Sequence, residues 1–154
     1  MILVVGATGN LGGIIAQSLL AKGKKVRVLV RPGSNASALT AKGAEAVAGD
    51  LKDPASLKGA LAGVETVITT ANSVLRGGAD TVDSVDIAGN KNLIDAAKAA
   101  GVKHFIFTSA LGSDVNHPVP LFQAKAKTEA LVKDSGMTWT ILAPNFFTDR
   151  KSVV

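Results

Sequence analysis

Short apolar runs alternate along the chain with segments in which apolar residues recur at helical spacing. The runs are rich in β-branched and aliphatic residues and end at a glycine or a polar turn, which is typical of strands buried on both faces. The sequence therefore predicts six short strands, over residues 2–5, 25–30, 44–48, 64–71, 103–109 and 138–142.

Helices are predicted between these strands. Leu11, Ile14, Ile15 and Leu19 lie on one face of a helix that Gly23 ends. The others are a short helix ending at 43, a helix over 54–62, a long helix over about 80–100 and a helix over 121–135. The apolar face of the long helix carries Val82, Val85, Leu93, Ala96 and Ala100.

Strands that alternate with helices form a parallel sheet, because each connection must cross back to the same edge. Right-handed crossovers then favour a Rossmann-type α/β fold of three layers, a doubly wound parallel sheet with strand order 3-2-1-4-5-6. The pattern has no break, repeat or linker, so residues 1–154 are expected to form a single domain.

The composition excludes several kinds of site. The chain has no cysteine and two histidines, so disulfides and thiolate sites are absent and a metal site is not expected. No segment is apolar over the length of a membrane span. The first strand follows Met1 directly, without the basic region of a signal peptide. The expectation is a cytoplasmic protein without a membrane partner.

The net charge of +5 raises the question of an anionic partner. Aromatic residues are 4% of the chain and tyrosine is absent, so no nucleic-acid partner is expected. The one dense basic cluster is Lys22, Lys24, Lys25, Arg27 and Arg31. These residues either form a solvated helix end and strand start, or they contribute to a site for an anionic cofactor.

The stretch VVGATGNLGG, near the start of the chain, points to such a cofactor. Gly6, Gly9 and Gly12 lie between a predicted strand and a predicted helix, which is the context of a dinucleotide-binding loop. In that context Gly6 permits the tight turn, Gly9 lets the backbone approach a pyrophosphate, and Gly12 lets the helix pack closely. The amides of Asn10 and Leu11 would then point at the anion, aided by the helix dipole.

Arg31 ends the second predicted strand, where an NAD site usually has an acidic residue for the ribose 2′-hydroxyl. A guanidinium there pairs with a 2′-phosphate, so the sequence predicts NADP(H) in preference to NAD(H). The alternative is a surface arginine at a strand end. Asp50 and Leu51 follow the third strand, and Ala71 and Asn72 end the fourth, so these residues also lie at the carboxyl edge. Asp50 alternatively caps a turn.

The chain resembles the NmrA-like branch of the atypical short-chain dehydrogenase/reductases, in the stretches VVGATGNLGG, AGDLKDPASL, NLIDAAKAAGVKHFIFTS, KAKTEALVKDSGMTWTIL and PNFF. That branch includes NADPH-dependent quinone and triphenylmethane-dye reductases, isoflavone-reductase relatives and redox-sensing regulators without catalytic activity. The resemblance implies either an NADPH-dependent oxidoreductase for a quinone, flavin or dye-like acceptor, or a module that senses NADP(H). It does not select a substrate.

The resemblance also assigns roles by position. The phosphate loop of the family falls on Gly6, Thr8, Gly9, Asn10, Leu11 and Gly12. Its remaining cofactor positions fall on Arg31, Asp50, Leu51, Ala71, Asn72 and Lys125. Its strand-five serine falls on Ser109, and its active-site lysine is the same Lys125.

The general short-chain mechanism uses a tyrosine acid, which this chain lacks, and Leu121 stands four positions before Lys125. The resemblance instead implies hydride transfer to an electron-poor acceptor whose product takes its proton from water. Lys125 would bind the nicotinamide ribose, or it is an exposed lysine paired with Glu129. Ser109 would donate to a substrate carbonyl or merely end its strand, and His117 is either catalytic or solvated.

The end of the chain departs from the family. Ala143 stands where relatives have an arginine, and the chain ends after NFFTDRKSVV, where relatives continue into a second lobe that covers the substrate. The sixth strand is uncharged, lies at the outer edge of the predicted sheet, and is followed by Phe146 and Phe147. An unpaired edge beside apolar residues predicts a homodimer through this strand and the C-terminal tail.

Overall fold

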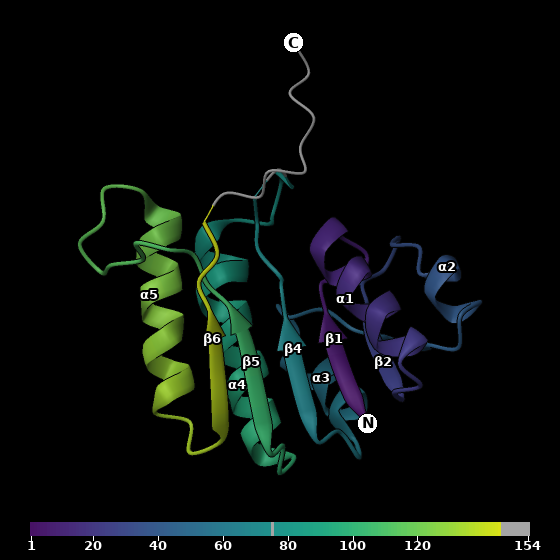
Figure 1. Cartoon of the computed structure of the whole chain (residues 1–154). Helices are drawn as coiled ribbons and strands as arrows, with labels where there is room; N and C mark the ends of the chain where they lie inside the picture. The colour runs from purple at the N-terminus through teal and green to yellow at the C-terminus, as the bar shows by residue number, and fades with distance from the viewer. Residues whose placement is uncertain (75, 146–154) are drawn as a thin grey trace.

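The computed structural model describes residues 1–74 and 76–145, and it confirms the predicted doubly wound architecture (Figure 1). Within the described residues, six parallel strands form one sheet in the order β3-β2-β1-β4-β5-β6. The strands are β1 (Ile2–Val5), β2 (Val26–Val30), β3 (Glu45–Ala48), β4 (Thr66–Thr69), β5 (His104–Thr108) and β6 (Thr138–Leu142). Each of them lies within its predicted range.

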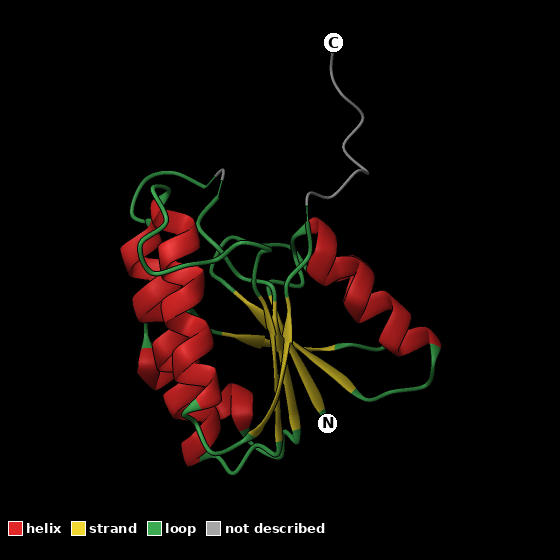
Figure 2. Cartoon of the chain, turned by 60° about the vertical axis from the view of Figure 1, so that its left-hand side comes forward, coloured by secondary structure: helices red, strands yellow, loops and turns green. Residues whose placement is uncertain are grey.

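Helices cover both faces of this sheet (Figure 2). One face carries α1 (Asn10–Ala21) and α2 (Ser37–Thr40). The other carries α3 (Pro54–Leu61), α4 (Asn90–Ala99) and α5 (Pro120–Lys133). The sheet is therefore the middle layer of three, and it has a separate apolar core on each side.

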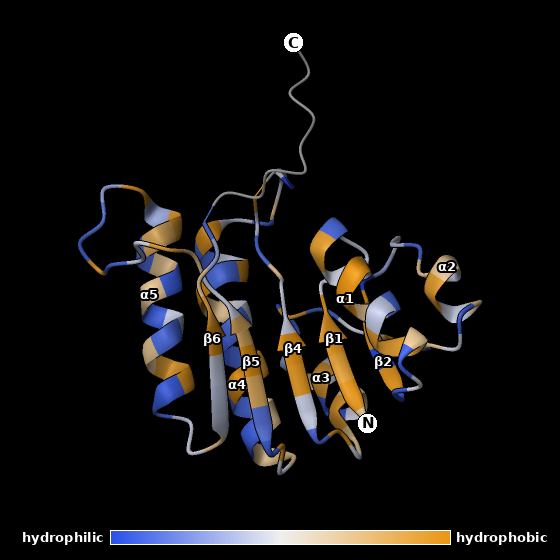
Figure 3. Cartoon of the chain, in the orientation of Figure 1, coloured by the Kyte–Doolittle hydropathy of each residue, from blue (hydrophilic) through white to orange (hydrophobic). Residues whose placement is uncertain are grey.

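The central strand β1 shows why these strands are continuously apolar. Leu3 and Val5 belong to the core beneath α3 and α4, together with Leu57 and other buried residues. Val4 belongs to the core beneath α1, together with Ala16. Because side chains alternate across a strand, a strand with helices on both faces needs apolar residues at every position. Figure 3 shows β1 in the colour of hydrophobic residues and the edge strand β6 much paler.

The long helix predicted over about 80–100 is present but differs from the prediction in its make-up and at both ends. It starts at residue 82 and has two parts, a π-helical segment η1 (Val82–Gly89) and the α-helix α4. Thr81 caps its start, because its side chain accepts a hydrogen bond from the Ser84 amide. Ala100 caps the other end and is exposed, so it does not belong to the apolar face. A π-turn adds a residue to the helical repeat and leaves no clear trace in hydropathy.

The edge expected to pair with a second copy is formed by β6, as predicted from the strand order. Trp139 and Leu142 on this strand are large and exposed. Phe146 and Phe147 lie outside the described residues, and the homodimer stays a prediction. In the part of the chain described, no helix has the length and apolarity to cross a membrane, and no acidic or histidine side chains are grouped as metal ligands.

Candidate functional site

The glycine loop turns tightly between β1 and α1. Gly6 has a φ of +85°, a conformation that side chains disfavour, and the Gly9 amide donates to the Gly6 carbonyl at 3.0 Å. Helix α1 then begins at Asn10 without a side-chain cap and without an acidic residue in its first turn. Its free amides and the positive end of its dipole are therefore available to an anion.

The three glycines of this loop differ in what surrounds them. A Cβ at Gly12 would lie 2.3 Å from the Gly6 carbonyl oxygen and 2.8 Å from Thr70 Oγ1, so the fold excludes a side chain there. A Cβ at Gly9 would have a single near neighbour, the Gly6 oxygen at 3.3 Å, and its φ of −91° is ordinary. Gly12 is therefore required for packing, whereas Gly9 leaves its space open.

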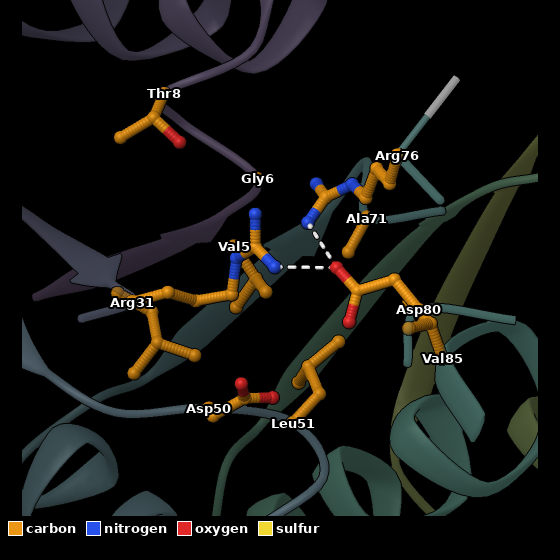
Figure 4. Close-up of a pocket in the computed structure, with 11 residues that line it drawn as sticks. Val5, Gly6, Thr8, Arg31, Asp50, Leu51, Ala71, Arg76, Asp80 and Val85 are labelled. Carbon is orange, nitrogen blue, oxygen red and sulfur yellow. Dashed lines mark hydrogen bonds and ion pairs between the residues drawn. The ribbon is translucent and has the colours of Figure 1, made fainter. Parts of the chain in front are cut away.

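A pocket opens beside this loop, at the carboxyl ends of β1, β2 and β4 (Figure 4). Six of the predicted cofactor residues line it together: Gly6, Thr8, Arg31, Asp50, Leu51 and Ala71. The sequence did not assign its other lining residues to the site, which are Val5, Leu29, Arg76, Asp80 and Val85.

The remaining predicted loop residues lie outside this lining. Gly9, Asn10, Leu11 and Gly12 form the start of α1. Asn72 turns the chain after β4, because its side chain donates to the Thr70 carbonyl and accepts from the backbone amide two residues on.

Asp50 caps a turn, as one of its two interpretations expected, and its role towards a cofactor stays a prediction. Its Oδ1 accepts a hydrogen bond from the Lys52 amide at 2.9 Å, so it caps the turn after β3. Its side chain also lines the pocket. The neighbouring Leu51 is buried, and its carbonyl accepts from Asn92 on α4 at 2.9 Å, which ties this turn to the helix behind it.

Four charged side chains form a group called the Asp80 cluster below: Arg31, Arg76 and Asp80, which line the pocket, and Lys52, which contacts Asp80 from outside that lining. Arg31 Nη1 lies 2.6 Å from Asp80 Oδ2, and Arg76 Nη1 lies 3.7 Å from the same oxygen (Figure 4). Lys52 Nζ bonds to the other carboxylate oxygen. Hydrogen bonds from Lys52 and Arg31 hold the pKa of Asp80 below its usual value, against an opposing effect of burial.

Sequence reasoning missed Asp80 and assigned it to the start of a helix. It lies before η1, in an isolated bridge with Gly77. One feature of the sequence could have indicated these residues. Arg76 and Asp80 come after β4, so they belong to the carboxyl edge of the sheet, where Arg31 was also predicted to lie. The path of their glycine-containing loop is what brings them into contact, and that path has no periodicity to reveal it.

The basic cluster of the sequence is divided in space. Arg31 is the member of that cluster that lines the pocket. Arg27 lies towards the opposite end of β2, where it pairs with Glu45 at 3.0 Å and donates to the carbonyls of Ala60 and Ala62. Its role is structural, since it ties β2 to β3 and to the end of α3.

Lys125 lies elsewhere along the carboxyl edge, on α5, and it is buried. Its side chain donates to the Thr108 carbonyl at 3.0 Å and lies 4.9 Å from the centre of the Phe107 ring. Burial lowers its pKa, and the charge of Asp86 partly opposes that shift. The alternative of an exposed lysine paired with Glu129 is therefore wrong, because Glu129 pairs with Lys133 at 3.6 Å.

Ser109 follows β5, and its hydroxyl donates to Glu129 on α5 at 2.5 Å. In this structure the hydroxyl therefore links a strand end to a helix. His117 has a local role as well. Its Nδ1 accepts from the Val119 amide at 3.0 Å, and its ring stacks on Phe122 with 4.4 Å between centres, so it stabilises the start of α5.

Asp86 on η1 is a second residue that sequence reasoning missed. It is 1% exposed, and its Oδ2 accepts from the Ser73 amide at 2.9 Å and from the Ser73 hydroxyl at 2.6 Å. Its Oδ1 and the Thr108 hydroxyl are buried without a hydrogen-bond partner. Asp86 is thus an acidic residue whose charge acts on Lys125 inside the protein.

Known proteins match this chain over most of its length. A family model described as NAD(P)H-binding matches residues 6–153. Photosystem II assembly factor Ycf39 of Cyanophora paradoxa is 46% identical over 140 residues, which are 91% of this chain and 43% of that protein. NAD(P)H azoreductase of Xenophilus azovorans is 37% identical over 147 residues, which are 96% of this chain and 48% of that protein.

A solved structure agrees with these matches. The NADPH-dependent quinone oxidoreductase QOR2 of Escherichia coli, in complex with NADPH, superimposes with a TM-score of 0.81 and 33% sequence identity. The match covers 97% of this chain and 50% of that one. The chain thus spans about half the length of the relatives that it matches, and the predicted resemblance is confirmed.

Proposed function

The chain belongs to the NAD(P)H-binding family, and from this premise we propose that it is an oxidoreductase that uses NADPH to reduce a small electron-poor acceptor. The acceptor is of the quinone, flavin or dye class. One observation carries the choice of cofactor: Arg31 faces the pocket at the end of β2, where an NAD site has an acidic residue.

The described residues suit a phosphorylated dinucleotide. The uncapped start of α1 offers free amides to a pyrophosphate, and Gly9 leaves room for it. Arg31 offers a guanidinium to the 2′-phosphate, and Leu51 and Ala71 offer apolar surface in the same pocket. Lys125 is the candidate for the nicotinamide ribose, although in this structure its amine is bonded to Thr108.

In the proposed reaction the acceptor gains one hydride, which carries two electrons, and takes one proton from water. The bound cofactor supplies that hydride and leaves as NADP⁺. The protein's part is to hold the cofactor by Arg31 and the start of α1, so that its reduced ring can meet the acceptor. A quinone or flavin needs little acid assistance, which is compatible with a chain that contains no tyrosine.

The names of two relatives support this class of reaction, since one is an azoreductase and another is a quinone oxidoreductase. A second candidate is a module that binds NADP(H) without catalysis. The 46% identity to a photosystem II assembly factor favours that second candidate. Both candidates share the cofactor pocket and differ in whether an acceptor is reduced.

The deciding experiment has two stages. Calorimetric titration with NADPH, NADP⁺ and NADH measures binding, with tighter binding of the phosphorylated forms as the expected result. Cofactor oxidation is then followed at saturating NADPH over a panel of quinones, flavins and dyes. Turnover of an acceptor supports the oxidoreductase, whereas binding without turnover over the whole panel supports the sensing module. Equal affinity for NADH and NADPH would contradict the choice of cofactor.

A further inference from the structure

The Asp80 carboxylate lies among cations from three parts of the chain. Arg31 directly follows β2, Lys52 lies in the turn after β3, and Arg76 lies in the loop after β4. All three contact the same carboxylate, whose side chain is 10% exposed. An internal anion thus sits in the pocket among the positive charges that a bound anion would require.

The segment that carries Asp80 is folded so as to place it there. Gly77 and Gly78 both have positive φ, of +75° and +62°, and turn the chain back on itself. The Asp80 amide donates to the Gly77 carbonyl at 3.3 Å, and the Ser84 hydroxyl donates to the Ala79 carbonyl at 2.8 Å. Backbone contacts on both sides therefore hold the carboxylate in the pocket.

The charges of the cluster are not balanced. Three cations face Asp80, and the nearest other acid is Asp50, whose Oδ2 lies 3.9 Å from Lys52 Nζ. A phosphate monoester carries about 1.5–2 negative charges at pH 7 and three acceptor oxygens. It therefore satisfies three cationic donors better than a carboxylate, which has one charge and two oxygens.

We propose that Asp80 occupies the place of the 2′-phosphate of NADPH and determines cofactor specificity by competing with that phosphate for Arg31, Lys52 and Arg76. The inference rests on the proposed function, because it concerns the same cofactor. It adds Lys52 and Arg76 to Arg31 as phosphate ligands. It also means that the wild-type chain binds NADPH less tightly than its three cations alone would allow.

The competition follows from electrostatics. A phosphate and a carboxylate in contact with the same guanidinium would repel each other at short range in a partly buried site. Asp80 must therefore give up its contact with Arg31 before the phosphate binds. NADH has an uncharged hydroxyl at this position, which can donate a hydrogen bond to the carboxylate, so Asp80 does not compete with NADH as it does with the 2′-phosphate.

Asp80→Asn tests the proposal, since it removes the charge and keeps the size and an acceptor oxygen. Calorimetry should show NADPH binding tightened about five- to tenfold, a normal size for coupling between two ligands of one site. NADH affinity should not increase, because the asparagine oxygen is at best an equal acceptor for the 2′-hydroxyl. A purely structural role for Asp80 gives the opposite direction, since loosening the cluster would weaken NADPH binding.

Asp83→Asn is the matched control. It removes the same charge from an exposed residue three positions away, for which no ion pair is found among the described residues. It should leave the affinity for both cofactors within about twofold of wild type, because an exposed charge away from the pocket is screened. Arg76→Gln should weaken NADPH and spare NADH, because Arg76 is assigned to the phosphate.

A measurement on the wild-type chain avoids any effect of substitution on folding. The side-chain carboxyl carbon of Asp80 is followed by NMR during titration with 2′,5′-ADP and, separately, with 5′-ADP. Its resonance should shift with the first ligand and stay in place with the second. A resonance that stays in place when 2′,5′-ADP binds would overturn the proposal.

The outcomes separate this inference from the proposed function. If wild type binds NADPH but Asp80→Asn binds it equally or less tightly, the competition is wrong and the function stands. If neither protein binds NADPH, both are wrong. Binding of NADPH by Asp80→Asn at concentrations where wild type shows none would support the competition in its strongest form.

Discussion

Two regions of the carboxyl edge hold their charges in different ways. In the pocket by β1 and β2, Arg31 pairs with Asp80 at 2.6 Å and remains 34% exposed. By β5 and α5, Lys125 and Asp86 are 6% and 1% exposed and are surrounded by the core. Charges of the first kind can exchange one partner for a ligand, whereas charges of the second kind contribute to the free energy of folding itself.

The difference predicts which property each substitution changes. In the Arg31 region, replacing one cation should change cofactor affinity more than stability, because Asp80 keeps its other two cationic partners. In the Lys125 region, a substitution should alter how stability depends on pH, because the buried amine has a lowered pKa in the folded state. The predictions below test this division, beginning with the largest expected effect.

Replacing Gly9 by valine should abolish dinucleotide binding and leave the protein folded. The fold leaves space at Gly9, whose Cβ would meet one atom at 3.3 Å, so the new side chain projects into the space assigned to the pyrophosphate. Calorimetry with NADPH measures the loss, and circular dichroism checks the fold. Undiminished binding would mean that the loop is only a turn.

Gly12→Ala is the contrasting variant within the same loop. Its Cβ would lie 2.3 Å from the Gly6 carbonyl oxygen, so the backbone must shift before the side chain fits. Overpacking of this kind typically costs about 1–3 kcal/mol, and denaturant unfolding should show it. If Gly12→Ala were as stable as Gly9→Val, the assignment of packing to Gly12 and binding to Gly9 would be wrong.

Arg31→Gln should weaken NADPH binding by about 1.5–3 kcal/mol, the size of a hydrogen bond to a charged group. NADH should be affected far less, and stability should change by less than about 1 kcal/mol because Asp80 keeps Lys52 and Arg76 as partners. Titration with both cofactors and thermal unfolding measure the two effects. Lys24→Gln, which removes one exposed positive charge outside the pocket, should change neither.

The sequence predicted the first region better than the second, for physical reasons. Gly6, Arg31 and Asp50 all follow strands whose apolar runs are unmistakable, and the ends of parallel strands meet at one edge. Their place in the pocket therefore follows from topology alone. Asp80 could not be found in this way, because it reaches the pocket through a loop.

Burial of polar residues was the other property that hydropathy could not show. Lys125 stands in the segment AKAKTEA, whose polar residues suggest an exposed helix face. It is buried because α5, which carries it, packs against η1. The π-helical segment η1 carries Asp86, and β5 provides the Thr108 carbonyl that accepts from Lys125. That environment comes from three distant segments, and none of them signals it locally.

Lys125→Met should change stability by less than about 1.5 kcal/mol in either direction, since the removed cost of burying the amine opposes the loss of its attraction to Asp86 and its hydrogen bond to Thr108. The same variant should reduce any acceptor reduction, because the amine is lost. Denaturant unfolding and NADPH oxidation measure the two properties. Lys127→Met, at an exposed position on the same helix, should change neither. A large loss of stability in Lys125→Met would instead show that the amine supports the fold.

The smallest expected effect is a dependence of stability on pH. Burial lowers the pKa of Lys125 below 10.5, and the unfolded chain restores the ordinary value. Between the two pKa values the unfolded state therefore binds more protons than the folded state. The free energy of unfolding contributed by this group then rises with pH across that window, and the cost of burial is fully present below it.

Subtracting the pH profile of Lys125→Met from that of wild type isolates the contribution of this amine from all other titrating groups. The difference should rise towards pH 10.5, whereas the same subtraction with Lys127→Met should give a flat line, and a flat line for Lys125 would show that its amine is solvated like an ordinary lysine.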